Sequence, residues 1–210
     1  MAIDRTALIQ ILRQELAGQP DRAGRGKWTA EHCVRVAKLA VALRQAVGAD
    51  PALDNLVFTA GLFHDVKHDS ASTPAAHGQE GAARTQELLA GLLPEKFLTH
   101  VCAIVAVHDD KRPPADSPYD TPTHLVQDAD LIDHNGAMEV YQSFCYGALH
   151  GRELVANLEY MERKTLPLWA RHVRRLHFDA ARLEWQRRTD FLKSFLRRIR
   201  QEEAGRLFEP

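Results

Sequence analysis

The sequence has little cysteine. Its three cysteines, Cys33, Cys102 and Cys145, lie far apart in a chain of 210 residues, and no Cys-x-x-Cys spacing occurs. Each lies in an apolar stretch with helical spacing, which favours a buried thiol over a disulfide or a metal-binding thiolate. We therefore expect three buried free thiols and a reducing, cytoplasmic location.

Long apolar runs and one-sided charge are also missing. No window approaches the roughly 20 consecutive apolar residues that cross a bilayer, and the first residues lack the pattern of a secretory signal. The net charge of −1 predicts neither a coat for nucleic acid nor an acidic tail. No Gly-x-x-x-x-Gly-Lys loop occurs, which argues against a kinase or a motor ATPase. Membrane partners are not expected, and nucleic acid is a poor candidate.

Runs of alternating or β-branched residues, typical of strands, are scarce, whereas nearly every long segment has the helical period. The sequence therefore predicts an all-α fold, and its length suits one large domain. The expected helices cover residues 4–17, 29–47, 52–66, 77–93, 95–108, 122–143, 152–171 and 174–203. In the last of them, the residues expected to face inward are Leu183, Phe191, Phe195 and Ile199.

Three histidines are in phase with the apolar faces of separate predicted helices. His32, His64 and His108 each have apolar residues four and seven positions away along the chain. A single histidine on such a face is more often a hydrogen-bonded core residue than a metal ligand. Three of them on different helices favour a shared site.

Acidic residues accompany two of these positions. Adjacent residues on a helix diverge by about 100°, so His64 and Asp65 can share one metal only where the helix ends, and the polar run that begins at Lys67 indicates such an end. The alternative is a local helix cap. Asp128 and Asp130 cannot be separated by helical phase, and both could instead be solvated residues near a helix start. Imidazoles and carboxylates from three helices make a mixed site for one divalent metal.

The motifs around these residues resemble the HD superfamily of metal-dependent phosphohydrolases. The resemblance rests on Glu-His32-Cys-Val-Arg-Val-Ala, on Gly-Leu-Phe-His64-Asp65-Val and on Asp128-Ala-Asp-Leu-Ile-Asp-His-Asn-Gly-Ala137. The last is similar to the Asp-Ala-Asp-Arg-Leu-Asp-x-x-Gly-Ala motif of a bacterial group. The resemblance implies one HD-type helical domain over residues 1–210, with a metal-binding core at about 25–145 and C-terminal helices at 152–203 packed on it.

Carried over by position, the resemblance implies a metal site of four side chains. Its ligands would be His32, His64, Asp65 and Asp130, since the family's aspartate directly follows the alanine. The implied cofactor is one divalent ion, with Mn, Fe, Co, Ni, Zn and Mg all open. The chain departs from the pattern at Leu131 and His124, where related proteins often have arginine and an acid, so substrate contacts could differ.

Further roles follow from the same resemblance and from nearby charges. Asp65 would orient or deprotonate a water, and His77 or His108 would donate a proton to the leaving oxygen or complete a second metal site. The candidate phosphate-binding cations lie close in sequence to these residues; they are Lys67, Lys111 and Arg112. Solvated surface is the alternative interpretation for all three.

The function that these features predict is hydrolysis of a phosphate ester or anhydride of a small nucleotide, by a pyrophosphohydrolase or phosphatase. The rival hypothesis is a non-catalytic helical module that binds nucleic acid or a protein partner. It rests on residues 171–200, where ten Lys or Arg residues stand against three Asp or Glu. An amphipathic helix with outward arginines explains the same bias. A homo-oligomer is left open.

Overall fold

The all-α prediction is confirmed. The computed structural model describes residues 3–19, 27–67 and 74–207, and this part of the chain contains helices and no strand. Residues 1–2, 20–26, 68–73 and 208–210 lie outside the described part, and with them the ends of the predicted domain, the start of its 25–145 core and the polar residues 68–70. The single-domain organisation stays a prediction.

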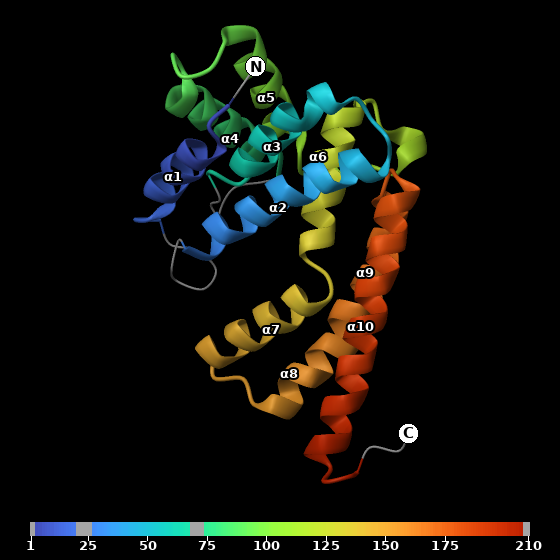
Figure 1. Cartoon of the computed structure of the whole chain (residues 1–210). Coiled ribbons are helices and arrows are strands. Elements are labelled where there is room, and N and C mark those ends of the chain that lie inside the picture. Colours follow the sequence, from blue (N-terminus) through green and yellow to red (C-terminus); the bar gives the residue numbers. More distant parts are fainter. Residues whose placement is uncertain (1–2, 20–26, 68–73, 208–210) are drawn as a thin grey trace.

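Six helices of the first part of the chain form a bundle, shown in blue to yellow-green in Figure 1. Their bounds are α1 Arg5–Leu16, α2 Lys27–Ala46, α3 Asp54–Phe63, α4 Pro74–Leu89, α5 Glu95–Val107 and α6 Thr121–Asp133. Helix α2 packs on α3 and α6, and α4 packs on α5. These contacts bring together the helices that carry the candidate ligands.

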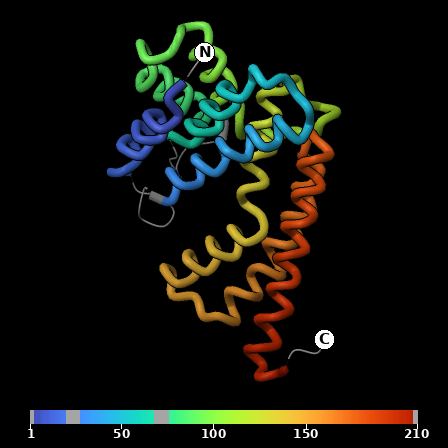
Figure 2. Tube along the Cα trace, in the orientation of Figure 1, coloured from blue at the N-terminus to red at the C-terminus, as the bar shows by residue number. Residues whose placement is uncertain are grey.

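The rest of the chain forms a second region, drawn in yellow to red. It contains α7 Ala137–Leu149, α8 Leu154–Tyr160, a π-helical segment Met161–Thr165, α9 Leu166–His172 and α10 Asp179–Glu203. The chain runs from α6 through α7 and α8, returns along α9, and then α10 passes beside α6 and α7 (Figure 2). Helix α10 therefore joins the second region to the bundle.

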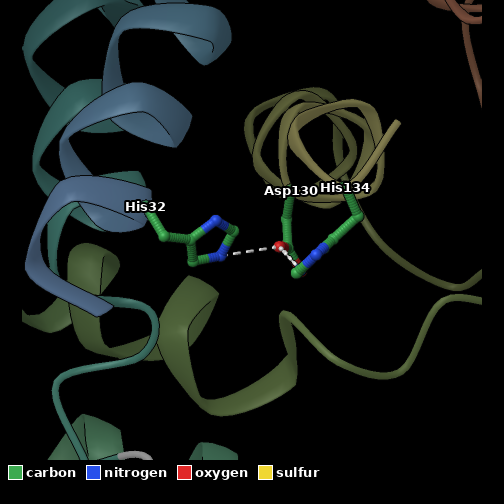
Figure 3. A group of neighbouring side chains, drawn as sticks. All are labelled: His32, Asp130 and His134. Atoms are coloured by element: carbon green, nitrogen blue, oxygen red, sulfur yellow. Dashed lines mark ion pairs between the residues drawn. The ribbon is translucent and has the colours of Figure 1, made fainter. Parts of the chain in front are cut away.

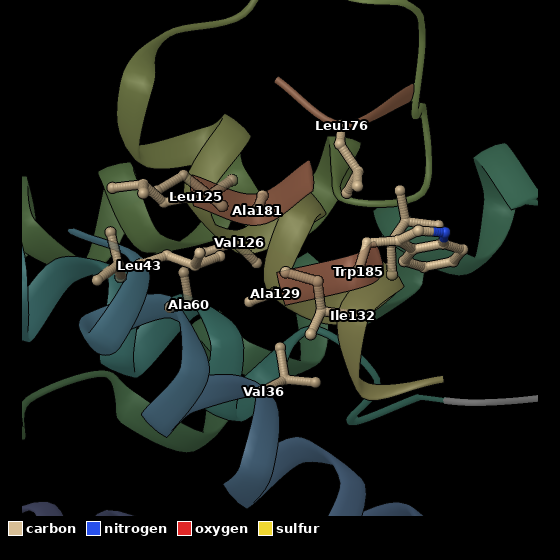
Figure 4. Packing of buried hydrophobic residues seen from close by; sticks show 14 of the residues in the cluster. Val36, Leu43, Ala60, Leu125, Val126, Ala129, Ile132, Leu176, Ala181 and Trp185 are labelled. Atoms are coloured by element: carbon tan, nitrogen blue, oxygen red, sulfur yellow. The ribbon is translucent and has the colours of Figure 1, made fainter. Parts of the chain in front are cut away.

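Two apolar cores hold these helices. The larger lies between α2, α3, α5 and α6 and is closed by residues of the second region, among them Leu176, Ala181 and Trp185 (Figure 4). The smaller packs α1 against α2 and α3, with Leu12 of α1 fully buried. No described helix is long and apolar enough to cross a membrane.

The helix predicted over residues 122–143 is in fact two helices. Gly136 separates α6 from α7 with a φ of 77°, and a Cβ at this position would collide with Arg188. The Asn135 side chain fixes the turn, since its Oδ1 accepts a hydrogen bond from Gly136 N at 2.7 Å while its Nδ2 donates to Trp185 O at 3.1 Å. The prediction failed because Asn135 and Gly136 lie inside an otherwise helical pattern.

Other sequence predictions are partly wrong. Leu183 and Phe191 of α10 are about half exposed, because the stripe that faces the core runs through Ala181, Trp185, Leu192 and Leu196. Phe195 and Ile199 do pack against the core. All three cysteines are free as expected, but only Cys33 is buried, and Cys102 and Cys145 are partly exposed.

Candidate metal centre

The four predicted ligands lie together between α2, α3 and α6. His32 Nε2 is 3.2 Å from His64 Nε2, 3.2 Å from Asp130 Oδ1 and 3.8 Å from Asp65 Oδ2. His64 Nε2 is in turn 3.7 Å from Asp65 Oδ2 and 3.6 Å from Asp130 Oδ1. We call His32, His64, Asp65 and Asp130 the quartet.

The adjacent residues of the quartet can face one point because α3 ends before them. The last residue of α3 is Phe63, and residues 64–67 form a turn. This agrees with the helix end expected from the sequence. His64 is fully buried, and Asp65 keeps 15% of its side-chain surface exposed.

Hydrogen bonds on the far side of each imidazole fix which nitrogen faces the quartet. His32 Nδ1 donates to Asp133 Oδ2 at 2.7 Å, and His64 Nδ1 donates to Gly61 O at 2.8 Å. Because Nδ1 is engaged on the far side, Nε2 is the ring atom that faces the carboxylates and the other imidazole. Metal-binding histidines are oriented by outer partners in the same way.

Charge within the quartet shows how well a cation fits there. Burial would lower the pKa of His32, but hydrogen bonds to Asp130 and Asp133 raise it to about 9. Burial would raise the pKa of Asp130, but the Lys111 ammonium and hydrogen bonds from histidines hold it well below the usual range. The site therefore favours positive charge. His32, His64 and Asp65 have the spacing of a divalent metal site, and so do His32, Asp130 and His134.

A second cluster uses the other oxygen of Asp65. His77 Nε2 is 2.8 Å and His108 Nε2 is 3.4 Å from Asp65 Oδ1. Their Nδ1 atoms donate to the carbonyl oxygens of Lys67 and Val105, at 2.9 and 2.7 Å. Together the three residues form a further group with metal-binding spacing, and Asp65 stands between this group and the quartet.

Close packing of α4 against α5 places His77 in this cluster. Gly78, the next residue of α4, lies so close to α5 that a Cβ would collide with the carbonyl oxygen of Ala106. A larger residue at 78 would push α4 away from α5, which ends just before His108.

Two residues of the site were missed in the sequence analysis. Asp133 holds His32 and also accepts a hydrogen bond from Arg35 Nε at 2.8 Å. His134 Nε2 lies 3.5 Å from Asp130 Oδ1, and Figure 3 shows His32 and His134 approaching this carboxylate from two sides. Both follow Asp130 by one helical turn, at three and four positions, and this spacing was the available signal.

The structure separates the two aspartates that helical phase left undecided. Asp128 is fully buried away from the quartet, where it accepts hydrogen bonds from the backbone N–H groups of His177 and Phe178 at 2.9 and 3.1 Å. Its carboxylate thus accepts hydrogen bonds from backbone N–H groups just before α10 begins. Asp130 is the aspartate that the structure brings to the quartet.

The three candidate phosphate-binding cations differ in their surroundings. Lys111 Nζ is buried and paired with Asp130 Oδ2 at 2.6 Å and Asp109 Oδ1 at 3.0 Å. Lys67 is exposed and does not line the cavity described below. Arg112 is exposed and paired with Asp110 at 2.9 Å. Phosphate binding by these three residues stays a prediction.

A cavity of about 830 Å³ opens beside the quartet and extends towards α7 and α8. Its lining comes from the bundle and from the second region and comprises Trp28, Thr29, His32, Asp65, His134, Glu139, Gln142, Ser143, Cys145, Tyr146, His150, Arg152 and Tyr160. A guanidinium that does face this cavity, Arg152, was not singled out from the sequence. The site is thus a His and Asp cluster at one end of a space large enough for a small molecule.

Comparison with known proteins agrees with this geometry. The HD domain pattern matches residues 29–135, just over half of the chain. The YpgQ protein of Bacillus subtilis, crystallised in complex with ADP, has the same fold with 22% identity, a TM-score of 0.63 and 94% of each chain covered. An HD-superfamily hydrolase from Bacillus thuringiensis has 23% identity and a TM-score of 0.68 over 96% of this chain and 97% of its own.

A further HD-superfamily hydrolase, from an uncultured Thermotogales bacterium, has 21% identity and a TM-score of 0.63 over 94% of this chain and 91% of its own. Among curated protein sequences, none matches this chain. All four residues of the quartet lie within the matched segment 29–135. On this match, the chain belongs to the HD domain family.

Proposed function

We propose that the chain hydrolyses a phosphate ester or anhydride of a small nucleotide, as a pyrophosphohydrolase or phosphatase. The observation that carries this proposal is the cavity, because it is lined by His32 and Asp65 at one end and has room for a nucleotide beyond them. YpgQ, which has the same fold, was crystallised with ADP. The nucleotide as ligand of this chain is part of our proposal.

In this proposal the quartet holds one divalent ion. When bound, such an ion would supply Lewis acidity for the phosphoryl group and for a water molecule. Asp130 contributes Oδ1, while its Oδ2 is held by Lys111 at 2.6 Å. Lys111 therefore positions Asp130 in this scheme, and the outer hydrogen bond from His32 to Asp133 orients the imidazole.

Asp65 is the proposed residue that orients the attacking water or removes its proton. Its side chain lies at the end of the cavity and is partly exposed. His77 and His108 face its second oxygen, and a protonated Nε2 on either is the proposed donor to the leaving oxygen. These two residues with Asp65 also have the spacing of a second ion site.

The rival module hypothesis draws on ten Lys or Arg residues, and four of them form ion pairs in the structure. Arg182, Arg188 and Arg198 lie 2.5–2.7 Å from acids of the same helix. Arg200 pairs with Glu162 at 2.8 Å. This compensation leaves less free positive charge for nucleic acid than the sequence indicates.

The free cysteines fit the proposed cytoplasmic location.

Metal analysis together with a nucleotide panel tests the proposed function. We expect about one equivalent or more of a divalent metal, and release of phosphate or pyrophosphate from at least one nucleoside phosphate. His64→Ala and Asp65→Ala should remove bound metal and lower kcat/KM more than 100-fold, since each deletes a proposed ligand. His100→Ala is the matched control, because His100 is exposed on α5 and pairs with Asp120. A protein that cleaves no nucleotide after loading with Mn would contradict the proposal.

A further inference from the structure

One wall of the cavity is a single face of α7. Glu139, Gln142, Ser143 and Tyr146 recur at the helical spacing of three, four and seven positions, and all of them line the cavity. This wall begins after residue 135, where the match to the HD pattern ends. Its chemistry therefore belongs to the second region of this chain.

Two polar groups of this wall lack the partners that buried groups normally have. Glu139 accepts a hydrogen bond from Thr165 Oγ1 at 3.3 Å, and within the described residues it has no ion pair. Burial of this carboxyl raises its pKa to about 7. The Nε2 atom of Gln142 is buried without a hydrogen-bond partner in the part of the chain that the structure describes. A bound molecule can supply what both groups lack.

Flat surfaces lie beside these two groups. Tyr146 and Tyr160 both line the cavity and are 43% and 47% exposed. The Arg152 guanidinium lies 4.5 Å from the ring centroid of Tyr160 and 5.6 Å from that of Tyr146. Its Nη1 donates to Asn157 Oδ1 at 3.3 Å, which fixes its position. Phenol rings and a guanidinium plane are surfaces on which a heteroaromatic ring stacks.

We propose that the α7–α8 wall binds the base of the nucleotide and selects adenine and cytosine, in which an exocyclic amino group lies beside an unprotonated ring nitrogen. The inference rests on the proposed function, because it places the phosphates of the same molecule at the quartet. Tyr146, Tyr160 and Arg152 supply the stacking surface. Glu139 accepts a hydrogen bond from the amino group, and Gln142 Nε2 donates to the ring nitrogen next to it.

The spacing of the two groups supports this assignment. Glu139 and Gln142 are three positions apart on α7, so their side chains leave the helix on the same side, about 5–6 Å apart at Cβ. An acceptor beside a donor complements an amino group beside a ring nitrogen. Adenine and cytosine have this edge, whereas hypoxanthine and uracil have a carbonyl oxygen in place of the amino group and an N–H in place of the accepting ring nitrogen.

Steady-state kinetics with matched triphosphates test the selection. ATP and ITP differ at the exocyclic position of the purine, and CTP and UTP form the same comparison in pyrimidines. We expect kcat/KM to be at least tenfold higher for ATP than for ITP and for CTP than for UTP. Equal values for each pair in the wild-type protein would overturn the inference while leaving the proposed function intact.

Variants show which residues make the selection. Glu139→Met keeps the volume but removes the acceptor, so the ATP to ITP ratio should fall to within threefold of one. Gln142→Met should reduce the same ratio, which keeps the test decisive if one variant folds poorly.

Tyr160→Leu should lower kcat/KM for ATP and ITP together, about fivefold or more, because stacking tolerates every base. Glu159→Met is the control, since Glu159 is exposed on α8 and does not line the cavity. A Glu139→Met protein that lowers both substrates equally would show a merely structural role.

Equilibrium binding separates this inference from the proposed function. Adenosine and inosine lack phosphates, so their binding to the wall needs neither metal nor hydrolysis. By NMR titration we expect the wild-type protein to bind adenosine more tightly than inosine. Glu139→Met should bind both nucleosides weakly and with the same affinity. If this holds but no nucleotide is cleaved, the base site stands and the proposed function fails. If neither nucleoside binds and triphosphates are cleaved without preference, the base site is refuted.

Discussion

The two ends of the cavity differ in how completely their polar groups are satisfied. At the bundle end, each imidazole of the quartet donates from Nδ1 to a fixed partner, and Asp130 is held by Lys111. At the α7–α8 end, and within the described residues, the half-buried Glu139 carboxyl has the Thr165 hydroxyl as its hydrogen-bond partner, and the buried Nε2 of Gln142 has none. The bundle end is organised before anything binds, as catalysis by charge stabilisation requires. The other end leaves its hydrogen bonds for a ligand to complete.

The largest effect that would test this contrast comes from the two aspartates of α6. Asp130→Asn removes a proposed ligand, so we expect loss of bound metal and more than a 100-fold loss of kcat/KM. Asp128→Asn should retain metal but lower the free energy of unfolding by about 1–3 kcal/mol, because the N–H groups of His177 and Phe178 lose a charged acceptor. Metal content by mass spectrometry and urea unfolding measure the two effects. Metal loss in Asp128→Asn alone would break the assignment.

Much of the fold could be predicted because helical periodicity is strong in the bundle. The break between α6 and α7 could not, since it depends on the hydrogen bonds of Asn135 to α10, a helix 50 positions away in sequence. The inward face of α10 was also misjudged at Leu183 and Phe191. Which face of α10 is buried depends on how the helix packs against α6 and α7, and this packing buries Trp185 and Leu192. The periodicity of the sequence alone does not determine that orientation.

The candidate site was predictable where residue type and motif agreed. Helical phase left Asp128 and Asp130 equal, and resemblance to a family favoured Asp130, the residue that lies with His32 in the structure. Nearness in sequence was a weaker guide for Lys67 and Arg112. Neither residue lines the cavity, and Arg112 pairs with Asp110. The wall of α7 was missed altogether, because its residues form a site only when the break at Gly136 turns α7 beside the cavity.

A smaller effect would sharpen the view that the bundle end is preorganised. Asp133→Asn weakens the hydrogen bond that orients His32, so we expect metal affinity to fall about 10- to 100-fold while the quartet itself is unchanged. Competitive titration with a metal-binding dye measures this. The matched control is Asp110→Asn, because Asp110 pairs with Arg112 and Tyr119 away from the quartet. Equal affinities in Asp133→Asn and the wild-type protein would show that His32 needs no outer support.

The smallest expected effect concerns stability at the α7–α8 end. Burial raises the pKa of Glu139 from 4.5 to about 7, so between these values the folded protein binds more protons than the unfolded chain. Stability should therefore fall as pH rises through this window, by at most about 3 kcal/mol. In Glu139→Gln this fall should disappear, which makes the variant more stable than the wild-type protein at pH 8 and not at pH 4. Glu162→Gln is the control of opposite sign, because the hydrogen bond from Arg200 lowers the pKa of Glu162. The ionised Glu162 therefore stabilises the folded protein, and this contribution is lost only as pH falls below 4.5, the ordinary pKa of a glutamate. Urea unfolding at pH 4, 6 and 8 measures all three proteins, and parallel pH curves for Glu139→Gln and wild type would show that this end of the cavity is satisfied without a ligand.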